Sequence, residues 1–248
     1  MSKKIGIIVA MDSEVSLIIS KFAYISSYTL VGSKFLVGKI GDADVVICKS
    51  GIGKVNAAIA VHNLILNEKP DCIINTGVAG SLDTRIMPKD IVIGTGVKYY
   101  DVWCGKPNSR GQVQGEPEWF PCIDLSMKGH GWSSIMRKYN SSRNYFSIHK
   151  GPMVSGDWFM ESAADKLKAL RACARAKAVD MESGAIAQVC SKFGVPFLPI
   201  RVISDVVGEK NHQEKYEEFW NDVTERSFDV LMQMVKDLCA NDTAGTGR

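Results

Sequence analysis

Three acidic side chains stand where predicted strands and helices meet. Glu14 follows the first apolar run, Glu182 comes just before a helical pattern, and Asp205 ends a later apolar run. In open α/β sheets ligands bind beyond the carboxyl ends of the strands, so these acids would meet in one crevice and serve acid–base chemistry there. Taken singly, an acid in such a place more often caps a helix. Spacing alone does not decide between the two interpretations.

Two glycine-containing segments also follow predicted strands. Residues 50–54 (SGIGK) resemble a phosphate loop, but Asn56 replaces the third glycine of GxGxxG and Val55 replaces the Ser or Thr of a Walker A motif. A tight strand-to-helix turn is the better interpretation. Residues 75–80 (NTGVAG) offer small side chains that allow a ligand to approach the backbone, although an ordinary turn at a strand end fits equally well.

Other kinds of site find little support. No HExxH, CxxC or GxSxG motif is present, which argues against a zinc centre and an α/β-hydrolase triad. The histidines share no short spacing and stand at His62, His130, His149 and His212. We therefore expect neither a metal nor a cofactor.

Charge and hydropathy restrict the partners. The 248 residues include 30 basic and 27 acidic side chains, a net charge of +3, which disfavours nucleic-acid binding. No run approaches the ~18 apolar residues that span a bilayer, so no membrane association is expected. The seven cysteines are odd in number and form no CxxC pair, which favours a cytoplasmic, reducing compartment.

Short apolar runs alternate with helical patterns along the chain. Strands are expected at 5–9, 45–48, 72–74, 90–93, 153–154 and 197–203, and helices at 15–22, 54–67, 185–193 and from 216 onward. Residues 76–77 should end the third strand, Gly194 should end a helix, and Pro199 argues against a regular central ladder. The inward face of the 54–67 helix should carry Ala57, Ala58, Val61, Leu64 and Ile65.

This alternation predicts an α/β fold with a mostly parallel sheet covered on both faces. No linker divides the chain, so residues 1–239 are expected to form one domain, followed by a flexible polar tail at 240–248. Residues 101–121 lack a clear period, and a loop of that length is usually functional or part of an interface.

Six segments then point to a family: IGIIVAMDSEV, KSGIGKVNAA, INTGVAG, VSGDWF, AVDMESGAIA and RVISDV. In this order and spacing, over roughly residues 4 to 238, the sequence resembles the 5'-methylthioadenosine/S-adenosylhomocysteine nucleosidases of the nucleoside phosphorylase superfamily. The resemblance implies a single α/β domain with a central mixed, mostly parallel twisted sheet flanked by helices. It also implies hydrolysis of the N-glycosidic bond of an adenine nucleoside, and a homodimer in which loop 101–121 lies near the neighbouring site.

The resemblance assigns roles to individual positions. Glu14 matches the acid that activates water, and Asp205 matches the acid that protonates adenine N7, with Ser204 orienting it. Glu182 matches the acceptor for the ribose diol, beside Met181 at the sugar.

The base has its own matching positions. Phe159 matches the ring that stacks on adenine, Met160 supplies a main-chain contact to the base edge, and Tyr216 falls near an aromatic residue that covers the site. The remaining pocket positions are Met11, Val78, Ala79 and Gly80.

Two other functions stay open on the same fold. A phosphate-dependent purine nucleoside phosphorylase would need anion donors within 75–80, where this chain has Asn75 and Val78, and Asp12 with Glu14 would repel phosphate. A non-catalytic nucleoside-binding protein is disfavoured because all three acids are present. Val78 stands where many of these nucleosidases have Ser, and Gln114 stands where an apolar residue is common. These departures bear on the preference for the 5'-substituent.

Overall fold

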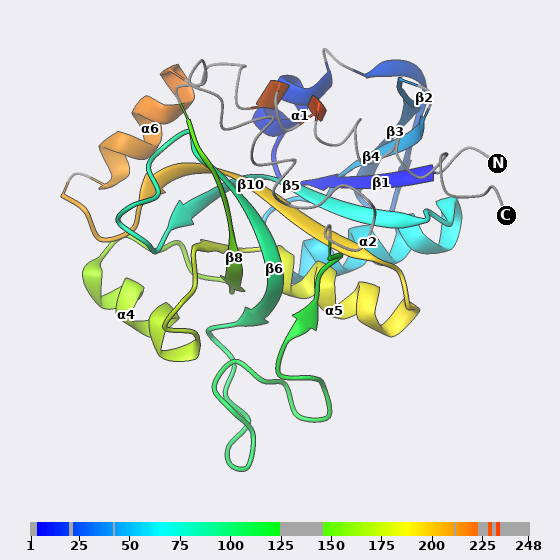
Figure 1. Cartoon of the computed structure of the whole chain (residues 1–248). Coiled ribbons are helices and arrows are strands. Elements are labelled where there is room, and N and C mark those ends of the chain that lie inside the picture. The colour runs from blue at the N-terminus through cyan, green and yellow to red at the C-terminus, as the bar shows by residue number, and fades with distance from the viewer. Residues whose placement is uncertain are drawn as a thin grey trace, which may run out of the picture.

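A mixed sheet of ten strands, with helices packed on it, makes up the part of the chain that the structure describes (Figure 1). The computed structural model describes residues 4–19, 22–41, 43–124, 146–210, 212–222, 228–229 and 232–233. The strands are β1 (Lys4–Val9), β2 (Ala23–Leu30), β3 (Ser33–Ile40), β4 (Ala43–Lys49), β5 (Cys72–Ser81), β6 (Ile91–Tyr99), β7 (Phe120–Pro121), β8 (Ile148–Ser155), β9 (Ala178–Asp180) and β10 (Phe197–Val206). The helices are α1 (Asp12–Ile19), α2 (Lys54–Glu68), α4 (Ala163–Ala172), α5 (Ser183–Phe193) and α6 (His212–Asp222). The predicted fold class is confirmed.

The middle of the sheet is parallel. Strands β4, β1, β5 and β10 lie side by side in one direction, so their carboxyl ends meet at one edge. Beyond them the sheet closes on itself, because β5 pairs with both β10 and β9, and β6 and β8 complete the ring. The cleft described below lies at the carboxyl ends of this parallel group.

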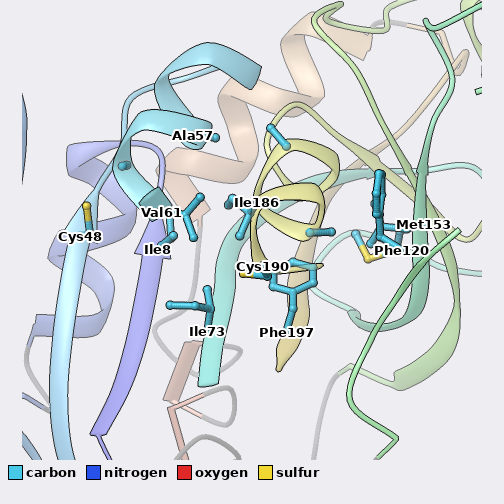
Figure 2. Packing of buried hydrophobic residues seen from close by; sticks show 14 of the residues in the cluster. Ile8, Cys48, Ala57, Val61, Ile73, Phe120, Met153, Ile186, Cys190 and Phe197 are labelled. Carbon is cyan, nitrogen blue, oxygen red and sulfur yellow. The ribbon is translucent and has the colours of Figure 1, made fainter. Parts of the chain in front are cut away.

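Both faces of β1 are covered, which explains its unbroken apolar run. Ile7 packs in a cluster with residues of α1 and α6, whereas Ile8 packs in a second cluster with residues of α2 and α5. Figure 2 shows the second cluster between these two helices and the strands. Side chains that alternate between two apolar layers are typical of a parallel strand buried on both faces.

The α2 and α5 helices follow their predicted patterns closely. The buried face of α2 includes Ala60, which the prediction omitted, whereas Ala58 is only half-buried. Gly194 ends α5 as predicted, with the left-handed φ of 66° that favours glycine.

Two expectations about the central strands are wrong. Strand β5 continues past Gly77 to Ser81, because β10 pairs with it along this whole length. Pro199 lies inside β10, opposite Asn75, and not at a break in the ladder. The antiparallel ladder with β6 begins one residue later, at Ile200, so the missing N–H of Pro199 lies just outside it.

Part of the C-terminal prediction lies outside the described residues. The helix expected from Tyr216 is seen as α6, and Phe228 and Met232 beyond it are buried. The rest of that helix and the polar tail at 240–248 are not among the described residues. Between β6 and β7, residues 100–119 form turns and irregular backbone, as expected for the long loop.

Candidate active site

The predicted site residues come together in one cleft at the carboxyl ends of the strands. The space in the cleft that no protein atom fills, open solvent included, is about 650 Å³. Each predicted position lines it: Met11, Glu14, Val78, Ala79, Gly80, Phe159, Met160, Met181, Glu182, Ser204 and Asp205. Tyr216 lines it as well.

Glu14 is held by backbone groups from the residues after β1 and from within β5. Its Oε2 accepts hydrogen bonds from the N–H groups of Ala10 (2.8 Å) and Met11 (2.9 Å), and its Oε1 accepts one from Val78 N (2.9 Å). The side chain is buried, and burial raises the pKa of its carboxyl although these donors and the charge of Arg201 oppose the shift. A carboxylate with a raised pKa is a stronger base than an exposed one, which suits it to accept a proton.

Gly77 makes this approach of Glu14 feasible. A Cβ at residue 77 would lie 2.2 Å from Glu14 Oε1, and the φ of 133° also disfavours other residues. Residues 75–80 thus lie within a strand and not in a turn, and they bring the backbone close to the carboxylate.

Asp205 lies near the end of β10, and no helix that it could cap begins within the described residues 206–210. Its Oδ1 accepts a hydrogen bond from the Ser204 hydroxyl, which also lies 3.3 Å from the carbonyl oxygen of Ala79. A Cβ on Gly80 would lie 3.1 Å from Asp205 Oδ2, so this glycine leaves room beside the acid. The carboxyl group therefore faces the cleft with its second oxygen beside Gly80.

Glu182 occupies the N-cap position of α5, yet its side chain makes no capping hydrogen bond. Its Oε1 instead accepts from Gly53 N at 3.0 Å, and its Oε2 lies 3.3 Å from the Arg201 guanidinium. Burial raises the pKa of this carboxyl to about 7, with Asp180 adding to the shift and Arg201 opposing it. Capping is thus the wrong interpretation for Glu182, since its hydrogen bonds run across the fold.

The turn at residues 50–54 therefore binds a side chain of the protein, a role that differs from both phosphate binding and a plain turn. Its Gly53 N–H donates to a carboxylate of the protein, and Ile52 lines the cleft. A phosphate at this N–H would compete with Glu182.

Aromatic rings close one side of the cleft. Phe159 and Tyr216 pack edge to face, with ring centroids 5.3 Å apart, and Trp158 also lines the space. Phe159 is 41 % exposed, so its ring is accessible to a ligand. A flat apolar ligand fits such a wall.

Comparison with known proteins decides the family. The model of the phosphorylase superfamily matches residues 4–236. The 5'-methylthioadenosine/S-adenosylhomocysteine nucleosidase of Halalkalibacterium halodurans is 38 % identical over 237 residues, which cover 94 % of this chain and 97 % of the relative. The chain belongs to this nucleosidase family of the phosphorylase superfamily.

Solved structures of nucleosidases share the fold. The enzyme from Colwellia psychrerythraea, in complex with adenine, is 32 % identical with a TM-score of 0.83, covering 94 % of this chain and 95 % of the other. The enzyme from Neisseria meningitidis, in complex with methylthio-immucillin-A, is 30 % identical with a TM-score of 0.85, covering 95 % and 99 %.

One residue of this nucleosidase-family chain was missed by the sequence analysis. Arg201 is fully buried in β10, where its guanidinium lies 2.7 Å from Asp180 and 3.3 Å from Glu182 and donates to the carbonyl oxygen of Thr76 at 3.2 Å. The signal was a single arginine within the apolar run FLPIRVISDV. A buried cation needs acidic partners, so it marks where acids gather.

The Val78 departure also has a structural explanation. The contact with Glu14 uses the backbone N–H of residue 78, which any residue except proline provides. The Val78 side chain packs against the core cluster below. The departure therefore leaves the hold on Glu14 intact.

Proposed function

We propose that this chain hydrolyses the N-glycosidic bond of 5'-methylthioadenosine and S-adenosylhomocysteine, releasing adenine and the 5-thioribose product. The observation that carries the proposal is the convergence of Glu14, Glu182 and Asp205, three buried acids, on one cleft with an aromatic wall. Relatives that span nearly the whole chain carry this activity in their names.

The proposed reaction begins at the base. Asp205 donates a proton to adenine N7 while the bond between N9 and C1' breaks, so that adenine leaves as a neutral molecule. The ribose then has the character of an oxocarbenium ion. Glu14 holds a water molecule and takes its proton as the water oxygen attacks C1'. In this mechanism the two acids act on opposite partners of one displacement.

Other residues of the cleft hold the two halves of the substrate. Glu182 accepts hydrogen bonds from the ribose diol beside Met181, Phe159 stacks on adenine under Tyr216, and the main chain of Met160 contacts the base edge. The walls around them are proposed to be Met11, Val78, Ala79 and Gly80.

Water is favoured over phosphate as the nucleophile. None of the described residues that line the cleft is basic, whereas four of them are acidic: Glu14, Asp180, Glu182 and Asp205. Arg201 below them is already engaged by two carboxylates. A dianion would therefore meet repulsion in this cleft, which disfavours the phosphorylase alternative.

The homodimer is part of the same proposal. Ile52, Val55 and Ile59, at the start of α2, are 51 %, 70 % and 39 % exposed, which is unusual for large apolar side chains that lie together. Loop 101–121 is tied to the neighbouring helix α5 by the ion pair of Glu116 with Lys192. We propose that two copies pack through this face and that the loop approaches the partner's cleft.

A reducing, cytoplasmic location belongs to the proposal as well. No disulfide joins any of the six cysteines that lie within the described residues. In the described part of the chain, no helix has both the length and the apolar character to cross a membrane.

The test incubates the protein with 5'-methylthioadenosine, once with phosphate and once without, and measures the released adenine by chromatography. The expected result is equal rates under both conditions. Strict phosphate dependence would make the protein a phosphorylase, and no adenine under either condition would favour a binding protein.

A further inference from the structure

Three charged residues form a closed set of side-chain and backbone hydrogen bonds beside the cleft. Asp157 Oδ1 accepts a hydrogen bond from Lys54 N at 2.7 Å, and Lys54 Nζ donates to Asp101 Oδ2 at 2.8 Å. The same Asp101 oxygen accepts from Asp157 N at 2.9 Å. This set, here named the Asp157 latch, joins the start of α2, the segment after β6 and the segment after β8.

The latch supplies the cap that α2 lacks locally. Gly53, the N-cap residue, has no side chain to satisfy the first N–H groups of the helix. Lys54 N donates instead to Asp157, which lies 103 residues later in the chain, and the preceding N–H, that of Gly53, donates to Glu182. Two consecutive N–H groups thus bind two carboxylates from different parts of the fold.

Glycines at two positions permit this close fit. A Cβ on Gly53, whose φ is 93°, would lie 3.0 Å from Asp157 Oδ1. A Cβ on Gly156 would lie 2.6 Å from Asp101 Cγ. Both carboxylates therefore lie directly against backbone.

The latch is also adjacent in sequence to the residues proposed to bind adenine. Asp157 directly precedes Trp158, Phe159 and Met160, which line the cleft, whereas Asp157 itself does not line it. The Tyr100 hydroxyl donates to the carbonyl oxygen of Trp158 at 2.9 Å, a second bond from the segment after β6 to the same residues.

We propose that Asp157, together with Asp101 and Lys54, is a positioning unit that fixes the turn holding Glu182 relative to the segment presenting Phe159 and Met160. The inference deepens the proposed function and rests on it, since Glu182 takes the ribose and Phe159 takes the adenine in that account. Asp157 acts through these residues and does not touch the substrate.

The test compares Asp157→Ala and Asp157→Asn with the parent chain in steady-state hydrolysis of 5'-methylthioadenosine. The alanine variant should raise KM about tenfold, with a smaller fall in kcat, because it frees both the turn and the base wall. Asparagine keeps an oxygen that accepts from Lys54 N, so it should restore most of the lost kcat/KM.

The dependence of kcat/KM on pH is a second measurement, and a loss of folded protein would not shift it. The Gly53 N–H favours the charged form of Glu182, and the other charged or titratable groups around that carboxyl are Arg201 on β10, Asp180 on β9, Glu14 on α1 and Tyr216 on α6. If Asp157→Ala loosens this N–H, the acidic limb of kcat/KM should move to higher pH.

A matched control is Asp71→Ala. Asp71 Oδ2 accepts the backbone N–H of Lys4 at 2.8 Å, at the amino ends of β1 and β5 and far from the cleft. This variant also loses a long-range carboxylate-to-backbone bond, and it should leave KM and the pH profile unchanged.

Each outcome decides the matter. Unchanged KM and pH profile in Asp157→Ala would overturn the inference, as would a lower kcat alone, which indicates fewer folded molecules. If the alanine variant does not fold, Lys54→Met carries the test, with a smaller rise in KM expected and no rise contradicting the latch. An inactive parent chain would instead refute the proposed function.

Discussion

Glu14 and Glu182, two of the acids that line the cleft, are held in contrasting ways. Glu14 receives three backbone N–H groups, two from the residues just before α1 and one from β5. Glu182 receives one backbone N–H, from Gly53, and otherwise depends on the buried side chain of Arg201. Backbone donors survive nearly every substitution, whereas a side-chain partner is lost in one step. The Glu14 side should therefore be sensitive to glycine replacement, and the Glu182 side to loss of charge.

Gly77→Ala should have the largest effect on activity. The added Cβ would overlap Glu14 Oε1 and force the carboxylate away from Val78 N, so we expect adenine release to fall about 10³-fold. Gly32→Ala is the matched control, because Gly32 also has a positive φ, 76°, but nothing within 4 Å of its Cβ position. Equal activity in the two variants would contradict the account of Glu14.

Arg201→Met should mainly affect stability. It leaves Asp180 and Glu182 buried without their cation, which is expected to cost about 3–5 kcal/mol of unfolding free energy in urea titrations. Arg85→Met removes an exposed, solvent-screened partner of Asp83 and should cost far less stability. Similar losses in both variants would mean that the buried cation has no special role.

Glu182 should also make stability depend on pH. Its folded-state pKa of about 7 lies above the ordinary value of 4.5, so the folded chain holds a proton that the unfolded chain releases. Stability is therefore greatest below about pH 4.5 as far as this group is concerned, and falls as pH rises toward and through 7.

Glu182→Gln should reduce that fall by roughly 1–3 kcal/mol, leaving the part due to Glu14, whose pKa is also raised. Urea titrations of parent and variant between pH 4.5 and 8 measure the difference. Parallel curves for the two proteins would mean that the pKa of Glu182 is the same in the folded and the unfolded chain, so that this side chain is charged in both.

Val78→Ser should have the smallest effect. The variant keeps the N–H that holds Glu14, so kcat/KM should stay within about fivefold of the parent. A much larger change would show that the side chain at residue 78, and not only its backbone, shapes the cleft.

The difference between local and long-range contacts explains which site residues the sequence could predict. Glu14, Glu182 and Asp205 were predicted because acids at strand ends follow the alternation of strands and helices, and the motifs carried by the resemblance include them. The role of Gly53 was missed because its partner lies 129 residues away. Arg201 was missed because a strand pattern hides a single charged residue, and its acidic partners come from β9 and from the residue just before α5.

Local pattern was also insufficient for parts of the sheet. The hairpin of β2 and β3 was not predicted, nor was α4, which Ser162 and Asp165 cap reciprocally. The full lengths of β5 and β10 depend on their mutual pairing, and that pairing overrides the signals of Gly77 and Pro199. The pairing of strands that lie far apart in the sequence is therefore what the sequence alone did not predict.

The most direct test of the central claim is Asp205→Asn, measured for both catalysis and binding. Adenine release from 5'-methylthioadenosine should fall by at least about 10²-fold, because the base then leaves without its proton. The 7-deaza analogue of 5'-methylthioadenosine has no N7 to protonate, so its Kd for the variant should stay within a few-fold of its Kd for the parent. Adenine release at the parent's rate would remove Asp205 as the acid and contradict the account.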